Sequence, residues 1–111
     1  MSAAEELTGR LRADLTAAMR QRDQPAIRAL RTLMGAVANA EAPPIDGAPL
    51  EVHGRLDQHE RLMLGDVDLA TIVAEQIADR ADTIATYRAN GRDDAADDLQ
   101  REVDVLTAYA G

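Results

Sequence analysis

The chain has 111 residues, a net charge of −8 at neutral pH, and no cysteine, lysine, phenylalanine or tryptophan. This length suits a single core, so we predict one domain over residues 1–111, and the missing cysteines exclude a disulfide framework and thiolate chemistry. The acidic charge argues against a general nucleic-acid-binding protein, because such proteins usually carry a clustered basic surface. Apolar residues make up 46% of the chain and 22 of them are alanine, the best helix former, so we predict an all-α fold.

Two amphipathic helices are predicted in residues 1–41, joined by a short turn. The first covers residues 5–22, since its apolar residues recur at steps of three and four and place Met19 on the apolar face. Asp23 is placed to cap the second helix, and Pro25 falls in its first turn, where the missing amide proton costs nothing. Gly35, inside this second helix, costs about 1 kcal/mol relative to alanine. Close approach of a neighbouring helix at Gly35 would offset that cost, so we expect one there.

Residues 42–66 form a long connection in which prolines and glycines break the helical periodicity. A structureless loop of this length is unusual in a compact domain. We therefore predict either a mobile insertion or a short helix around residues 54–64, and we favour the short helix.

Two more helices are predicted after this connection. Asp66 or Asp68 is expected to cap the third, which carries the longest apolar stripe of the chain, and Gly91 is expected to end it in a left-handed conformation. The fourth covers about residues 93–109, with an apolar face spaced for packing. Four helices in two hairpins predict a small antiparallel bundle.

No set of residues in the chain matches a catalytic, cofactor or metal site, and we predict none. His53 and His59 are spaced six apart, which would put them on different faces of a helix, so we interpret them as loop residues. Tyr87 and Tyr109 lie on apolar stripes, where we expect the rings to pack against the core. Four aspartates crowd the start of the last predicted helix, and we expect them to complement its dipole. They are Asp93, Asp94, Asp97 and Asp98.

The basic residues are all arginine and they concentrate near the first predicted turn. Residues 1–41 hold six arginines against five acids, whereas residues 67–111 hold four against ten. Four of these arginines form the one basic cluster that could face phosphate groups. The alternative, which we favour, is that they cover helix surfaces and pair with the acidic second hairpin. They are Arg20, Arg22, Arg28 and Arg31.

Four stretches are distinctive in combination: LRADLTAAMR at residues 11–20, LRTLMGAVANAE at 30–41, IATYRANGRDDAA at 84–96 and EVDVLTAY at 102–109. Together they resemble the YqeY-like proteins, which share a domain with the tail of the aspartyl/glutamyl-tRNA amidotransferase B subunit. Members of this family typically continue past the last tyrosine into a smaller helical subdomain, which we expect this chain to lack. Their third helix tends to carry a basic run, where this chain has the acidic residues Asp79 and Asp82.

The resemblance implies a non-enzymatic helical binding module of the GatB/YqeY type, linked to tRNA or to an amidotransferase-like protein. At most it would be an accessory to amidotransferase activity. The alternative is a protein-interaction or self-association module, for example a homo-oligomer, with no role toward tRNA. Since no segment resembles a signal peptide or approaches membrane-spanning length, we predict a cytoplasmic protein without a membrane or DNA partner.

Overall fold

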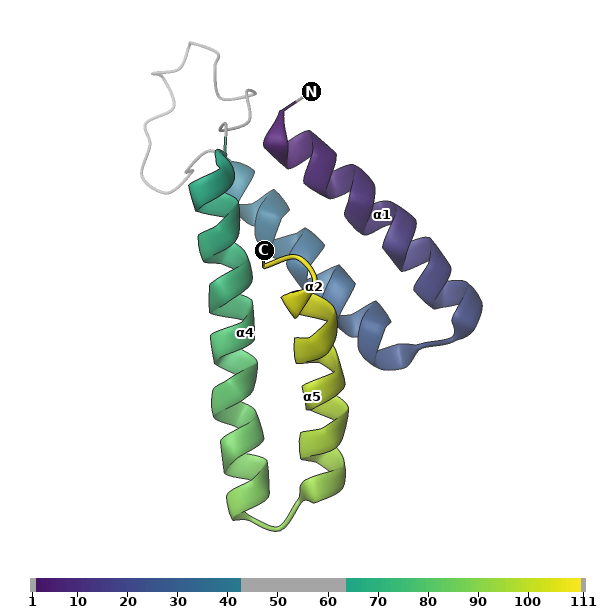
Figure 1. Ribbon diagram of the computed structural model, residues 1–111, viewed down its shortest axis with the longest axis vertical. Coiled ribbons are helices and arrows are strands. Elements are labelled where there is room, and N and C mark those ends of the chain that lie inside the picture. The colour runs from purple at the N-terminus through teal and green to yellow at the C-terminus, as the bar shows by residue number, and fades with distance from the viewer. Residues whose placement is uncertain (1, 43–63, 111) are drawn as a thin grey trace, which may run out of the picture.

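Two antiparallel helix pairs make up the computed structural model, which describes residues 2–42 and 64–110 (Figure 1). The first pair is α1 (Ala3–Gln21) and α2 (Gln24–Glu41), and the second is α4 (Asp66–Ala89) and α5 (Asp93–Thr107). The all-α prediction and the two hairpins are therefore confirmed. The short helix predicted around residues 54–64 falls almost entirely outside the described residues.

Local capping signals set the ends of the first pair. The Ser2 hydroxyl accepts from the Glu5 amide at 3.1 Å, and the Glu5 carboxylate accepts from the Ser2 amide at 2.9 Å, so α1 begins two residues earlier than predicted. These bonds lower the pKa of Glu5, with the bond from the Ser2 amide as the main cause. The predicted cap of α2 is confirmed, because the Asp23 carboxylate accepts from the Ala26 amide at 3.2 Å.

The second pair confirms one predicted boundary and corrects two. Gly91 has φ +73°, the left-handed conformation that lets the chain leave α4 and enter α5 after a few residues. Neither predicted aspartate caps α4, because Gly65 occupies the cap position and the Asp68 carboxylate accepts from the Gly65 amide at 3.0 Å. Asp68 thus supplies the reciprocal half of a capping box. The last helix ends at Thr107, two residues earlier than predicted.

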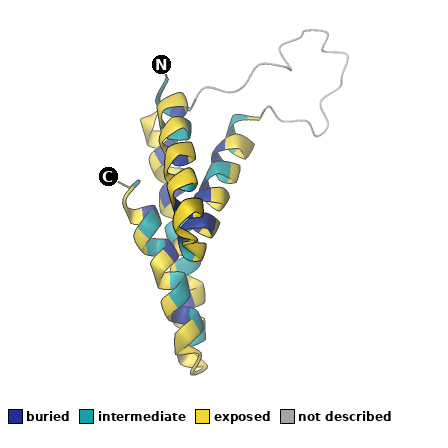
Figure 2. Ribbon diagram, turned by 90° about the vertical axis from the view of Figure 1, so that its right-hand side faces the viewer, coloured by how far each residue is buried: buried dark blue, intermediate teal, exposed yellow. Residues whose placement is uncertain are grey.

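The core gathers on α2, which contacts all three other helices (Figure 1). In Figure 2 the buried residues follow the faces that the helices turn toward one another. The side chains that are fully buried include Leu11, Leu33 and Leu106, contributed by α1, α2 and α5. Aliphatic burial of this kind supplies most of the stability of a small helical domain.

Two expectations about this core are wrong. Gly35 lies on the exposed side of α2, and no atom of another described residue lies within 4 Å of the point where its Cβ would be. No close helix contact therefore offsets its cost. Met19, which the periodicity placed on the apolar face of the first helix, is 49% exposed. Met19 lies in the last helical turn of α1, where the apolar stripe ends close to the loop that leads to α2.

Candidate partner-binding surface

The turn between α1 and α2 carries the first two arginines of the predicted cluster. Arg20 lies in the last turn of α1, and Arg22 caps that helix with a left-handed backbone at φ 57°. The Arg22 amide donates to the Met19 carbonyl at 3.2 Å, and the Asp23 amide donates to the Ala18 carbonyl at 3.0 Å. These bonds end α1 without a glycine. Both arginine side chains remain exposed, with no partner among the residues that the structure describes.

Arg28, the third arginine of the cluster, binds the second hairpin instead. Its Nε donates to Glu102 at 2.8 Å and its Nη2 donates to Asp98 at 2.9 Å. Arg80, from α4, donates from Nε to the other Glu102 oxygen at 2.9 Å and from Nη1 to the Gln76 side chain at 3.0 Å. The hydrogen bond with Glu102 raises the pKa of Arg28 above its usual value. We call Arg28, Arg80, Asp98 and Glu102 the inter-hairpin network.

The inter-hairpin network joins α2, α4 and α5 through one buried carboxylate. Glu102 is 5% exposed, the one buried charged residue in the described part of the chain, and it receives a guanidinium on each oxygen. A buried carboxylate needs such partners, because an unpaired one would be strongly destabilising. The pairing of arginines with the acidic hairpin, favoured from the sequence, is thereby confirmed for Arg28 alone. Arg31, like Arg20 and Arg22, has no partner within the described ranges and stays exposed.

Unpaired charge is segregated between the two hairpins. Within residues 2–42 and 64–110, four arginine side chains make no hydrogen bond, ion pair or ring contact, and all four belong to the first hairpin: Arg12, Arg20, Arg22 and Arg31. Arg12 was not part of the predicted cluster, although the periodicity of the first helix places it on the polar face. The unpaired carboxylates of the same ranges lie on the second hairpin, apart from Glu6. They are Asp66, Glu75, Asp79, Asp82 and Asp94.

Tyr109 ties the end of the described chain back to α1. Its ring lies beneath the Arg10 guanidinium, 4.2 Å from the ring centre, and its hydroxyl donates to the Asp14 carboxylate. Arg10 also donates from Nη2 to the Ala108 carbonyl at 2.9 Å. Burial, and then the bond to Asp14, raise the pKa of Tyr109 above its ordinary value. Like Tyr87, Tyr109 is partly buried, and its ring packs against the core as expected.

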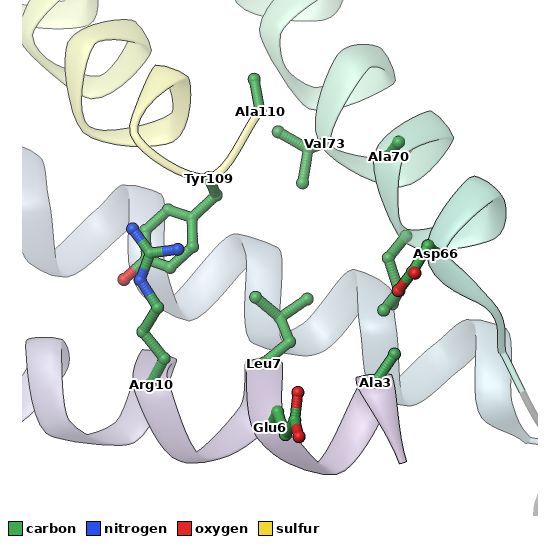
Figure 3. Close-up of a pocket in the computed structure, with 10 residues that line it drawn as sticks. Ala3, Glu6, Leu7, Arg10, Asp66, Ala70, Val73, Tyr109 and Ala110 are labelled. Atoms are coloured by element: carbon green, nitrogen blue, oxygen red, sulfur yellow. The ribbon is translucent and has the colours of Figure 1, made fainter.

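Beside Tyr109, a groove of about 550 Å³ separates the first half of α1 from the first half of α4 (Figure 3). Leu7 and Val73 point into it from the two helices, and Tyr109 and Ala110 line one end. The sequence did not indicate this groove, because it depends on how far the two hairpins diverge.

The described residues test only part of the prediction that the chain has no metal or catalytic site. His53 and His59 lie outside the described residues, and in the parts that are described no three metal-ligating side chains come together. Asp93 lies in the first turn of α5, as dipole complementation requires. In addition, Arg88 pairs with Asp97 at 3.1 Å and with Asp93 at 3.8 Å, so the crowded aspartates also join α4 to α5.

The chain is similar to a known protein family over the region that contains its helices. The family described as Yqey-like protein matches residues 8–111, nearly the whole chain and all four helices. The chain belongs to the YqeY-like family. The resemblance drawn from the four sequence stretches is thereby confirmed.

Two curated relatives share the name "Altered inheritance of mitochondria protein 41, mitochondrial". The relative from Pyrenophora tritici-repentis is 29% identical over 104 residues, which is 92% of this chain and 48% of the relative. The relative from Candida glabrata is 26% identical over 101 residues, which is 91% of this chain and 48% of the relative. The chain thus spans about half the length of these relatives. Among the described helices, none has the length and apolar content to cross a membrane.

Proposed function

We propose that this YqeY-like chain is a non-enzymatic binding module of the GatB/YqeY type, and that its first hairpin contacts tRNA. The observation that carries the proposal is the segregation of unpaired charge. Every arginine without a partner in the described ranges lies on α1, α2 or the turn between them, while the acidic side chains without partners lie mainly on the second hairpin. A polyanion would meet guanidinium groups on one hairpin and be repelled by the other, which orients the contact.

A binding role also suits the scarcity of nucleophiles. The sole serine of the chain is Ser2, and its hydroxyl caps α1; the chain has no cysteine and no lysine. Covalent catalysis of amide chemistry often uses a serine, cysteine or lysine beside a base, and in the described residues the single candidate of these types, Ser2, is engaged as a helix cap. We propose a role as accessory to an amidotransferase-like enzyme, without a cofactor, in the cytoplasm.

The test is fluorescence anisotropy of a labelled tRNA pool titrated with the protein at low and at physiological salt. If three arginines meet phosphates, affinity falls about 20- to 40-fold for a fourfold rise in salt. A variant that neutralises the three unpaired arginines nearest the turn weakens this binding and makes its dependence on salt shallower. It is Arg20→Gln/Arg22→Gln/Arg31→Gln, which leaves the inter-hairpin network intact.

A matched control separates a local contact from the effect of total charge. Three exposed alanines on α4 are replaced by glutamate, which lowers the net charge by the same amount and touches no arginine: Ala74→Glu/Ala78→Glu/Ala85→Glu. The proposal predicts that this variant keeps most of the wild-type affinity. Equal loss in both variants, or no binding by the wild type at low salt up to high micromolar protein, would contradict it.

The alternative is protein association or self-association without tRNA. Two large apolar side chains favour it, because Met19 is 49% exposed and Val67 is 79% exposed. It predicts a mass in sedimentation that rises with protein concentration and depends little on salt.

A further inference from the structure

The groove between α1 and α4 is lined by apolar side chains that the packing covers to different extents: Leu7 is half-buried and Ala70 is exposed, whereas Leu69 and Val73 are buried. Leu7 from α1 and Leu69 and Val73 from α4 line it, and the Tyr109 ring and Ala110 line one end (Figure 3). α1 and α4 make less contact with each other than either makes with its own hairpin partner. Its volume of about 550 Å³ is enough for several side chains of a bound segment.

The charge around this apolar lining is negative. Glu6 on α1 and Asp66 on α4 line the groove, both are exposed, and neither has a partner within residues 2–42 and 64–110. Arg10 also lines it, but its guanidinium is engaged by the Tyr109 ring, the Ala108 carbonyl and Asp14. A bound group therefore meets two carboxylates whose charge is not compensated locally.

These features discriminate among occupants. A nucleic acid is disfavoured because phosphates would face Glu6 and Asp66. A second copy in a symmetric arrangement would bring two acidic rims together, and both copies carry a net charge of −8. A protein segment with apolar side chains on one helix face and lysine or arginine on its flank satisfies both the apolar lining and the acidic rim.

We propose that this groove is a docking site for a basic amphipathic helix of a partner protein. Its apolar face packs on Leu7, Ala70 and the Tyr109 ring, which are accessible apolar side chains of the groove, and its cations pair with Glu6 and Asp66. The site is distinct from the proposed tRNA surface, since none of the four unpaired arginines lines the groove. It therefore stands whether or not tRNA binds the first hairpin.

The experiment lets the groove select its own ligand. A phage-displayed library of short random peptides is selected against the whole protein, and the winners are synthesised with a fluorescent label. The expected winners are amphipathic and basic, and Ala70→Arg, which places a bulky cation in the groove wall, weakens their binding about tenfold or more. Ala74→Arg, one turn further along α4, exposed and outside the groove, is the matched control and keeps wild-type affinity.

A second pair of variants tests the charge, since any basic peptide is attracted to an acidic protein. Glu6→Gln/Asp66→Asn is expected to weaken binding about 2- to 30-fold, whereas Glu75→Gln/Asp79→Asn, which removes the same charge outside the groove, has a smaller effect. Acidic or patternless winners, or equal losses in matched variants, would overturn the proposal. So would a dimer in sedimentation that Ala70→Arg dissociates, because the groove would then belong to a second copy.

Discussion

Glu102→Ala removes the carboxylate that receives both Arg28 and Arg80, and it is the sharpest perturbation of the contact between the hairpins. Glu102 is 5% exposed and the Arg80 side chain is 12% exposed, so the change leaves a guanidinium nearly buried and short of one hydrogen bond. Breaking a buried pair on one side costs about 3–5 kcal/mol. The Arg28 side chain is 46% exposed, so solvent screens its share of the interaction.

We therefore expect Glu102→Ala to lower the free energy of unfolding by about 3 kcal/mol, at the lower end of that range, because Arg80 keeps its bonds to Gln76. For a domain of this size the midpoint of thermal unfolding falls by about 10–20 °C. Urea denaturation followed by circular dichroism measures the change. Arg28→Ala is expected to cost about 1 kcal/mol, since its partner Glu102 keeps Arg80.

The matched control is Glu75→Ala, because Glu75 is exposed and has no partner in the described part of the chain. The reasoning predicts a change within about 0.5 kcal/mol for this control. A double variant, Arg80→Met/Glu102→Leu, is expected to recover stability relative to Glu102→Ala, because apolar side chains of similar volume need no partner. If Glu102→Ala cost no more than Glu75→Ala, the inter-hairpin network would not hold the hairpins together.

Three further results are expected. Gly35→Ala stabilises the fold by about 1 kcal/mol in urea denaturation, because Gly35 is exposed in a regular helix with open space at its Cβ position; a loss of stability would contradict this. Gly91→Ala destabilises by about 1–2 kcal/mol in the same assay, because the left-handed φ of +73° penalises any Cβ, and an unchanged stability would refute the strain argument. Because the raised pKa of Tyr109 keeps the folded state neutral where the unfolded state ionises, stability is fully present below the ordinary tyrosine pKa of about 10 and falls as pH rises above it. In Tyr87→Phe, where Tyr109 is the sole tyrosine, the absorbance titration at 295 nm should have a midpoint above that of the urea-unfolded chain, and equal midpoints would exclude the shift.

Boundaries that depend on neighbours in sequence could be predicted. Asp23 caps α2 and Gly91 ends α4 because each acts within one helical turn, where residue type decides the backbone. The start of α4 was missed because an aspartate at the cap and an aspartate three residues later give similar sequence patterns. Only the geometry shows that Asp68 accepts from the amide of Gly65.

Pairing of Arg28 with the acidic second hairpin was predicted, but its specific partners in the inter-hairpin network could not be, because these residues are far apart in sequence. Arg28 and Glu102 are separated by 74 positions, and only the packing of the hairpins brings them together. A signal was nevertheless present. Arg80 falls on the apolar stripe between Ile77 and Ile84, and Glu102 falls on a stripe four residues before Leu106, so each is a charge where burial is expected. A charged residue within an apolar stripe needs a partner. A cation on one stripe and an anion on another therefore predict that the two side chains pair.

The groove and the split of the arginine cluster depend on the same packing. Arg28 and Arg31 lie one turn apart on α2, yet one pairs with α5 and the other is exposed. Sequence spacing shows that such residues share a helix face, and it does not show where a second helix crosses that face.

The measurement that tests the central claim most directly is the salt dependence of tRNA affinity in the wild type and in Arg20→Gln/Arg22→Gln/Arg31→Gln. Each phosphate contact contributes about 0.7–0.9 to the slope of the logarithm of affinity against the logarithm of salt concentration. If the first hairpin contacts tRNA through these arginines, the slope in the variant is shallower by about 2–3 than in the wild type. Equal slopes in the two proteins would contradict the claim, because the arginines would then meet no phosphate.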